Sequence, residues 1–403
     1  MSRNMQYLEE IQLAAYRRVD PKGEFKRRHA KEFSFITQKN HPTHRRTLDT
    51  LKTLLGKPFL NPRKVRVSRK DTKKLMERYS KFESPIFANT IDRARTIAEN
   101  ALREIHEEAK IFKHDAKIID TIVFGSMPSV LLNAAAIRVP KTDEYVIVMN
   151  EGMPRFLARM ARIILRADAA ISLEGFERLN LRAEGWEDGF RDLVKEAIFE
   201  DEHDYLIDHT VAAVCDYFGI SIGLAYDHDV YRSFDRLMAE IVTTGAEVFV
   251  IAHEYSHVLN GHLVSWTAET LTMLDDEVEV GDRAPGIEHH ADISAMTAIL
   301  HAGNLDPIEL GFLADSNIFS YYLERGPQHF FICADILEKS AKLLFGTVPN
   351  HGTHPPGHER FEILRELTSS EDNNVAITRY AIVAEELQDV ALKLLGGVYG
   401  KNR

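Results

Sequence analysis

The chain has 403 residues, 44% of them hydrophobic, and a formal net charge of −11, values that fit a globular protein with a large core. Its two cysteines, Cys215 and Cys333, disfavour a disulfide framework and favour a reducing compartment. No apolar run reaches the length of about 18 residues that a membrane span needs, and the first residues lack the parts of a signal peptide. We therefore expect a soluble, cytoplasmic protein without a transmembrane segment.

Positive charge is concentrated near the N-terminus. Residues 17–74 contain 19 lysines and arginines against 5 acidic residues, which leaves a net charge of −25 on the rest of the chain. Such an asymmetry predicts a solvated basic surface, or a surface that binds nucleic acid, an acidic partner or the protein's own acidic body. The dipeptide Ser84-Pro85 marks the predicted boundary between this basic N-terminal region, 1–84, and the main domain, 85–403.

The hydrophobic pattern predicts an α+β protein that is mostly helical. Apolar residues recur at helical intervals over long stretches with few glycines or prolines. A polar stretch at 274–286 predicts a surface loop. The expected helices span 5–18, 89–112, 152–167, 186–199, 201–218 and 287–302, and three or four more are centred near residues 312, 336, 363 and 384.

Three segments rich in isoleucine and valine, 117–124, 130–139 and 144–149, predict a small sheet. The last two are joined by a connection of hairpin length. Small side chains in the second strand would let an extended peptide add to its edge, although an ordinary strand packed against a helix is the alternative. The candidate substrate-binding residues of this strand are Asn133, Ala134, Ala135 and Ala136.

The clearest chemical signal lies in residues 245–262. His253-Glu254-x-x-His257 is the HExxH signature, in which helical spacing directs both imidazoles to one metal ion and the glutamate flanks it as a general base. The preceding residues are apolar on every side, which predicts a buried helix, and Asn260-Gly261 predicts its end. The alternative is a pair of hydrogen-bonded core histidines, but a metal would satisfy their polar atoms.

A catalytic zinc site has three protein ligands and leaves a fourth position for water. The metzincin pattern would need glycine at position 259 and histidine at position 263, where this chain has Leu259 and Leu263. His262 is offset by one residue and is interpreted as a polar end to the helix. The third ligand must therefore come from elsewhere in the chain.

Glu288, near the start of the helix predicted over 287–302, is the best-placed candidate for the third ligand, and His289 and His290 are its rivals. Asp292 lies four residues after Glu288, on the same helical face. It could therefore accept a hydrogen bond from the non-ligating nitrogen of a zinc-bound histidine.

The combination of HExxH with Glu288-x-x-Ala291-Asp292 resembles the gluzincin metallopeptidases of the HtpX and CAAX prenyl protease family. Asn133-Ala134-x-Ala136, followed by a strand and by Gly152 at a helix start, is similar to the family's substrate-binding edge strand and hairpin. The segment from His354-Pro355 to Arg360 resembles its C-terminal His-Pro-x-x-x-x-Arg element. The resemblance extends discontinuously over about residues 85–370.

The resemblance implies a zincin-like catalytic domain with one zinc ion on His253, His257 and Glu288, and with Asp292 beside the ligands. It places His354 and Arg360 near the cleft, where they would stabilise charge or anchor Asp292. The chain departs from much of the family because it lacks membrane spans or an export signal. It also carries a helical insertion at about 168–244, between the hairpin and HExxH.

These expectations add up to a zinc-dependent endopeptidase that hydrolyses a protein or peptide substrate with Glu254 as its base. His354 is the first candidate for the oxyanion donor and Tyr255 the second. The basic N-terminal region or the inserted helices would restrain such an enzyme by covering its cleft. The alternatives are a regulatory or phage-defence protease with one target, and a non-catalytic, zinc-stabilised binding module, against which Glu254 argues.

Overall fold

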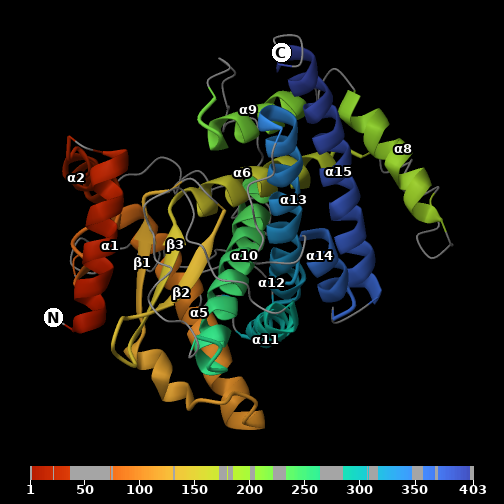
Figure 1. The fold of residues 1–403 in the computed structure, drawn as a ribbon. Coiled ribbons are helices and arrows are strands. Elements are labelled where there is room, and N and C mark those ends of the chain that lie inside the picture. Colours follow the sequence, from red (N-terminus) through yellow and green to blue (C-terminus); the bar gives the residue numbers. More distant parts are fainter. Residues whose placement is uncertain are drawn as a thin grey trace, which may run out of the picture.

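A computed structural model gives the fold of most of the chain. It describes residues 2–20, 22–36, 73, 76–129, 132–171, 179, 185–199, 205–220, 233–263, 285–305, 307, 316–346, 357–367 and 371–399. These residues form one small sheet surrounded by helices, as the α+β pattern predicts (Figure 1). None of the helices described is long and apolar enough to cross a membrane.

The predicted helices that fall on described residues are present, with shifted ends. The centre of the helix predicted near residue 312 lies outside the described residues, as does the loop predicted at 274–286 up to residue 284. Before the sheet come α1 (Arg3–Val19), α2 (Phe25–Ile36), α5 (Pro85–Ala109) and the 3₁₀ helix η1 (Ala116–Thr121). After it come α6 (Gly152–Asp168), α8 (Trp186–Phe199), α9 (Tyr205–Tyr217), α10 (Ser233–Leu259), α11 (Pro285–Ala302), α12 (Ser316–Leu323), α13 (Gly326–Phe345), α14 (Gly357–Arg365) and α15 (Glu371–Tyr399).

The sheet has the strand order β1-β3-β2. Strands β2 (Ala134–Arg138) and β3 (Tyr145–Asn150) form the predicted antiparallel hairpin, and β1 (Val123–Met127) runs parallel to β3. The prediction of a strand over 117–124 is wrong for most of this segment, because β1 begins only at Val123. Residues 116–121 form η1, because Asp115 caps that turn by accepting a hydrogen bond from the backbone N–H of Lys117 at 2.8 Å.

The two faces of the sheet are covered by different helices. Leu8 and Ile11 of α1 pack on one face, and residues of α5 and α10 pack on the other. Gly125 permits the close approach of α1, because a Cβ atom there would lie 2.6 Å from Leu8. The sheet therefore lies between α1 and α10 (Figure 1).

Polar side chains also attach α1 to the sheet. The Gln12 amide donates to the backbone oxygen of Ser126 at 2.7 Å, and the Tyr16 hydroxyl donates to Glu151 at 2.8 Å. The described start of the basic N-terminal region is thus packed on the far side of the sheet from α10, where it does not cover HExxH. Half of its lysines and arginines, among them all those between residues 37 and 72, lie outside the described residues.

The helix that carries HExxH, α10, is the central element of the main core. It packs against α5, α6, α11, α12 and α13 and is buried along nearly its whole length, as its apolar pattern predicts. Gly245 of α10 meets Gly326 of α13 at a backbone crossing. A Cβ atom on Gly326 would lie 2.2 Å from the carbonyl carbon of Gly245, so the two helices can approach this closely only without side chains.

Replacement of Gly326 by alanine should therefore destabilise the protein, by about 3 kcal/mol at the upper end of overpacking effects, because neither backbone can move away easily. Chemical denaturation of the purified chain measures this change. Gly397→Ala is the matched control, since a Cβ atom on this exposed glycine of α15 has no neighbour within 4 Å. The control should gain up to about 1 kcal/mol from helix propensity. Equal stability of the two variants would contradict the close contact of α10 and α13 at Gly245 and Gly326.

Candidate metal centre

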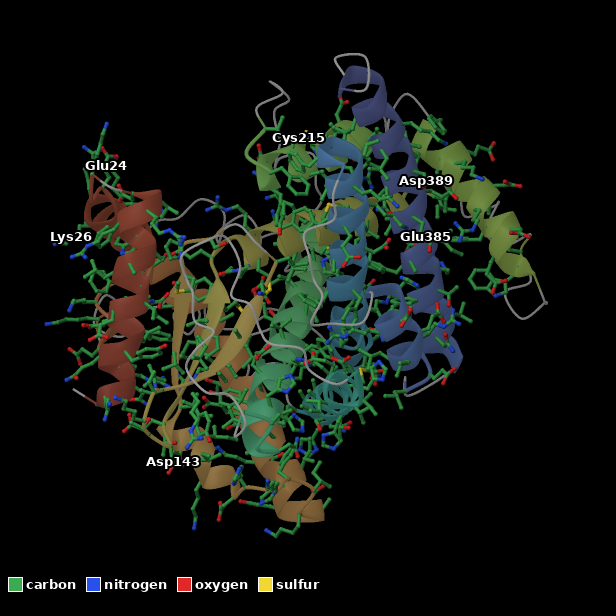
Figure 2. The ribbon with its side chains drawn as sticks, viewed as in Figure 1. Glu24, Lys26, Asp143, Cys215, Glu385 and Asp389 are labelled. Atoms are coloured by element: carbon green, nitrogen blue, oxygen red, sulfur yellow. The ribbon has the colours of Figure 1, made fainter. Side chains whose placement is uncertain are left out.

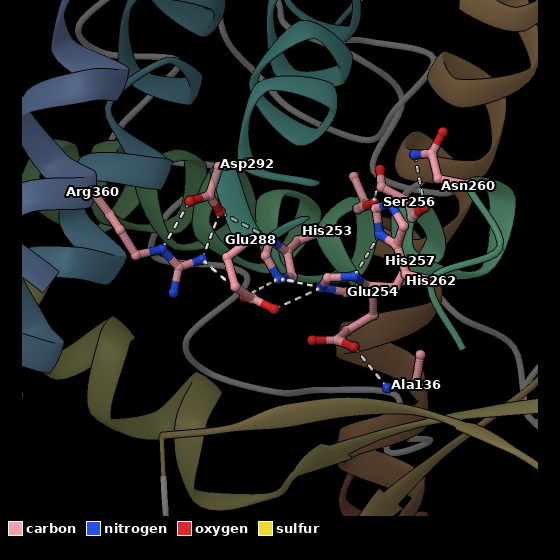
Figure 3. A network of polar contacts seen from close by, with 11 residues as sticks. Ala136, His253, Glu254, Ser256, His257, Asn260, His262, Glu288, Asp292 and Arg360 are labelled. Carbon is pink, nitrogen blue, oxygen red and sulfur yellow. Dashed lines mark hydrogen bonds and ion pairs between the residues drawn. The ribbon is translucent and has the colours of Figure 1, made fainter. Parts of the chain in front are cut away.

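Two packed helices bring the predicted metal ligands together. His253 and His257 lie one turn apart on α10, and Glu288 lies in the first turn of the neighbouring helix α11 (Figure 3). Their ligand atoms all lie within 4.8 Å of one another, and all three side chains are buried. Among the described residues, this is the one group of His, Cys, Asp and Glu side chains arranged to hold a metal ion.

The distances within this triad are short and similar. The Nε2 atoms of His253 and His257 are 3.0 Å apart. Glu288 places one carboxylate oxygen 3.3 Å from Nε2 of His253 and the other 3.4 Å from Nε2 of His257. Each imidazole therefore faces the Glu288 carboxylate with its Nε2 atom. The Nδ1 atoms of the two rings point to other partners. A metal ion could be held between these three side chains.

Asp292 supports His253 from behind, as its spacing predicts. Its carboxylate lies 2.9 Å from Nδ1 of His253 and accepts two hydrogen bonds from Arg360 of α14, at 2.6 and 2.8 Å. Arg360 is itself held over the ring of Phe331, 4.6 Å from its centroid. A bidentate, buried pair of this kind fixes the carboxylate, and through it the plane of the imidazole.

The same contacts change the protonation of these groups. Burial alone would lower the pKa of His253, but hydrogen bonds to Asp292 and Glu288 raise it to about 9. Burial alone would raise the pKa of Asp292, but the Arg360 guanidinium keeps it below its ordinary value. His253 thus lies between two carboxylates, a position in which positive charge is stabilised.

Glu254 lies beside the triad and is not one of its three members. One of its carboxylate oxygens accepts a hydrogen bond from the backbone N–H of Ala136 in β2, at 2.6 Å (Figure 3). Its side chain is 4% exposed, so this contact ties a buried carboxylate to the predicted substrate-binding strand.

The hairpin register divides the four candidate residues, Asn133 just before β2 and the three alanines that begin it, into two groups. The N–H of Asn150 donates to the oxygen of Asn133, and the N–H of Val139 donates to the oxygen of Glu144. Because hydrogen-bonded and non-hydrogen-bonded pairs alternate in an antiparallel ladder, Asn133 and Ala135 face β3 with their backbone groups. Ala134 and Ala136 present theirs to the outer edge of β2, where the described residues form no further strand.

Other sequence predictions are separated from the triad. His289 and His290 follow Glu288 on α11, but the triad takes its third member from Glu288. The Tyr255 hydroxyl donates to Glu99 of α5 at 2.5 Å, so it does not serve as an oxyanion donor here. His354, the other candidate donor, lies outside the described residues.

His262, interpreted from the sequence as a polar helix end, contacts one of the predicted ligands. Its Nδ1 atom lies 3.0 Å from Nδ1 of His257, a contact that its sequence position alone does not reveal.

Comparisons of the chain with models of known protein families, with curated proteins and with solved structures found no match. The chemistry of the site is therefore inferred from its residues and their geometry.

Replacing Asp292 by asparagine should weaken Zn²⁺ binding by about tenfold to 100-fold, because the partner of a ligating histidine loses its charge. Competition with a chromophoric chelator measures this affinity. Asp389→Asn, on the exposed side of α15, is the matched control and should bind Zn²⁺ like the unaltered chain (Figure 2). Equal affinity of both variants would show that Asp292 does not support the ligand.

Proposed function

We propose that the protein is a zinc-dependent endopeptidase. The observation that carries this proposal is the buried triad together with a carboxylate, Glu254, that faces an open strand edge. Ligand atoms 2.0–2.1 Å from a tetrahedral zinc ion lie about 3.3 Å apart. The distances of 3.0, 3.3 and 3.4 Å between the triad atoms agree with this spacing.

The donor set also favours zinc. Two imidazoles and one carboxylate suit zinc better than magnesium or calcium, which prefer oxygen ligands. Three protein ligands are typical of catalytic zinc sites, whereas structural sites use four and commonly include cysteine. Cys215 and Cys333 are not part of the triad. A carboxylate such as Glu254 has no task in a structural site, so the binding-module alternative is disfavoured.

When bound, zinc would supply a Lewis acid and lower the pKa of a water molecule toward about 7. Glu254, next to His253 on α10, would accept a proton from the attacking water and deliver it to the leaving amine. His253 and His257 keep their ligating nitrogens aimed at one point because their rings are fixed from behind. Asp292 and Arg360 hold the first of these rings.

An extended peptide is the substrate that the edge of β2 fits. Ala134 offers its backbone N–H and C=O on the outer side of the strand, Ala136 offers its C=O, and their small side chains leave room for a guest chain. Ala136 already binds Glu254, so a peptide paired with this edge would lie within one hydrogen bond of the proposed base. This arrangement supports cleavage within a chain, and the motif resemblance to the HtpX and CAAX prenyl protease family points the same way.

Replacing Glu254 by glutamine should leave about one zinc ion per chain and lower proteolysis of an unfolded protein substrate at least about 100-fold, because the base is lost. Zinc content and peptide release are measured on the same preparation. Glu247→Gln is the matched control on the same helix. Burial raises the pKa of Glu247 to about 8, so a neutral amide there resembles the protonated side chain at pH 7 and activity should persist. Undiminished cleavage by Glu254→Gln would rule Glu254 out as the base.

The edge-strand proposal predicts that Ala134→Pro lowers kcat/KM by about tenfold or more, since proline removes one outward N–H from the substrate-binding edge, where it is tolerated, and leaves the Ala136–Glu254 hydrogen bond in place. Zinc content and thermal stability should stay near those of the unaltered chain. Ala134→Ser keeps the N–H and should retain activity. If both variants cleave equally well, the substrate does not use this edge.

A further inference from the structure

The end of α10 is closed by a specific set of backbone hydrogen bonds. The N–H of Gly261 donates to the oxygen of Val258 at 3.0 Å, and the N–H of His262 donates to the oxygen of His257 at 2.9 Å. Gly261 has a φ of 68°. This pair of bonds around a left-handed glycine is the Schellman motif, which turns the chain back over the last turn of the helix.

The motif places His262 over His257, five residues earlier. An apolar contact between such positions is common, but here both residues are histidines. Their Nδ1 atoms are 3.0 Å apart, and their ring centroids are 5.2 Å apart at an angle of 63°. The two imidazoles therefore share one hydrogen bond, in which one ring donates and the other accepts.

The direction of this hydrogen bond follows from the triad. Nε2 of His257 faces His253 and Glu288, at 3.0 and 3.4 Å, so Nε2 is the nitrogen on the metal side. A neutral imidazole that ligates through Nε2 carries its proton on Nδ1. In the loaded site, His257 must then donate from Nδ1, and Nδ1 of His262 must accept.

We infer that His262 is a positioning residue for the metal site: it accepts the Nδ1 proton of His257 and so fixes the tautomer and ring plane of that ligand. The inference rests on the proposed zinc site and extends it. His253 is held by an anion, Asp292, whereas His257 is held by a neutral ring. The hydrogen-bond partner of His253 is thus negatively charged, whereas that of His257 is uncharged. The segment from His257 to His262 contains both a proposed metal ligand and the residue that orients it.

The test compares two replacements of His262 in the full chain. His262→Phe keeps a ring of similar size without an acceptor, whereas His262→Asn keeps an oxygen at the δ1 position. We expect Zn²⁺ affinity, measured by chelator competition, to fall about tenfold to 100-fold in the phenylalanine variant and to be largely restored in the asparagine variant. The visible spectrum of the Co²⁺-loaded protein should change in the phenylalanine variant and stay close to that of the unaltered chain in the asparagine variant. A merely structural role of the ring would not produce this spectral difference.

Two further variants keep the test decisive. His290→Phe alters a ring that lies 5.8 Å from His262 and outside the triad, so its Zn²⁺ affinity should not change. Gly261→Ala should weaken Zn²⁺ binding like His262→Phe. Alanine is strained in the left-handed backbone conformation of this position, and its Cβ atom would lie 2.9 Å from Nε2 of His114. Thermal unfolding of each zinc-free variant shows whether it is folded.

The outcomes separate this inference from the proposed function. If the unaltered chain binds Zn²⁺ and His262→Phe binds it equally well with an unchanged Co²⁺ spectrum, the role of His262 is overturned and the zinc site stands. If the unaltered chain binds no Zn²⁺, the proposed function fails and this inference fails with it. Weakened binding by His262→Phe that His262→Asn restores supports the assigned role.

Discussion

The burial of two carboxylates, Glu288 and Asp292, on either side of the His253 imidazole is the constraint on which this structure depends. Glu288 and Asp292 are 0% and 1% exposed, and a buried negative charge is costly unless a positive group compensates it. Arg360 compensates Asp292 through two hydrogen bonds, but it lies 4.0 Å from Glu288. The two histidines face the Glu288 carboxylate at 3.3 and 3.4 Å, and a cation between the three side chains would balance its charge further.

This constraint requires that the helices be fixed with little tolerance. Ligand atoms separated by about 3 Å lose their common centre when α10 and α11 slide by even a fraction of a helical turn. Contact on all sides of α10 prevents such sliding, and the crossing at Gly245 and Gly326 fixes its position relative to α13. The core thus also fixes the geometry of the group that could hold a metal ion.

The sequence predicted those parts of the site that follow from short-range periodicity. His253 and His257, and likewise Glu288 and Asp292, are four residues apart, and helical geometry alone directs each pair to one side. The role of His262 does not follow from spacing, because it depends on a chain reversal after Gly261 that the sequence indicates only as a helix end. The turn at 116–121 was mistaken for a strand because a short apolar run fits either structure. The docking of α1 on the sheet depends on distant contacts that no local pattern contains.

The covering of both faces of the hairpin limits what kind of client this protein could accept. With α1 against one face and α10 against the other, a guest chain could join only in the plane of the sheet, and the outer side of β2 is the edge that lies beside Glu254. Pairing of that kind needs several consecutive residues with unoccupied backbone groups. In folded helices and sheets these backbone groups are already hydrogen-bonded. Unfolded tails, loops and misfolded segments could therefore pair with the edge, whereas intact domains could not. Selection would then depend first on the conformational state of the client and only afterwards on its side chains.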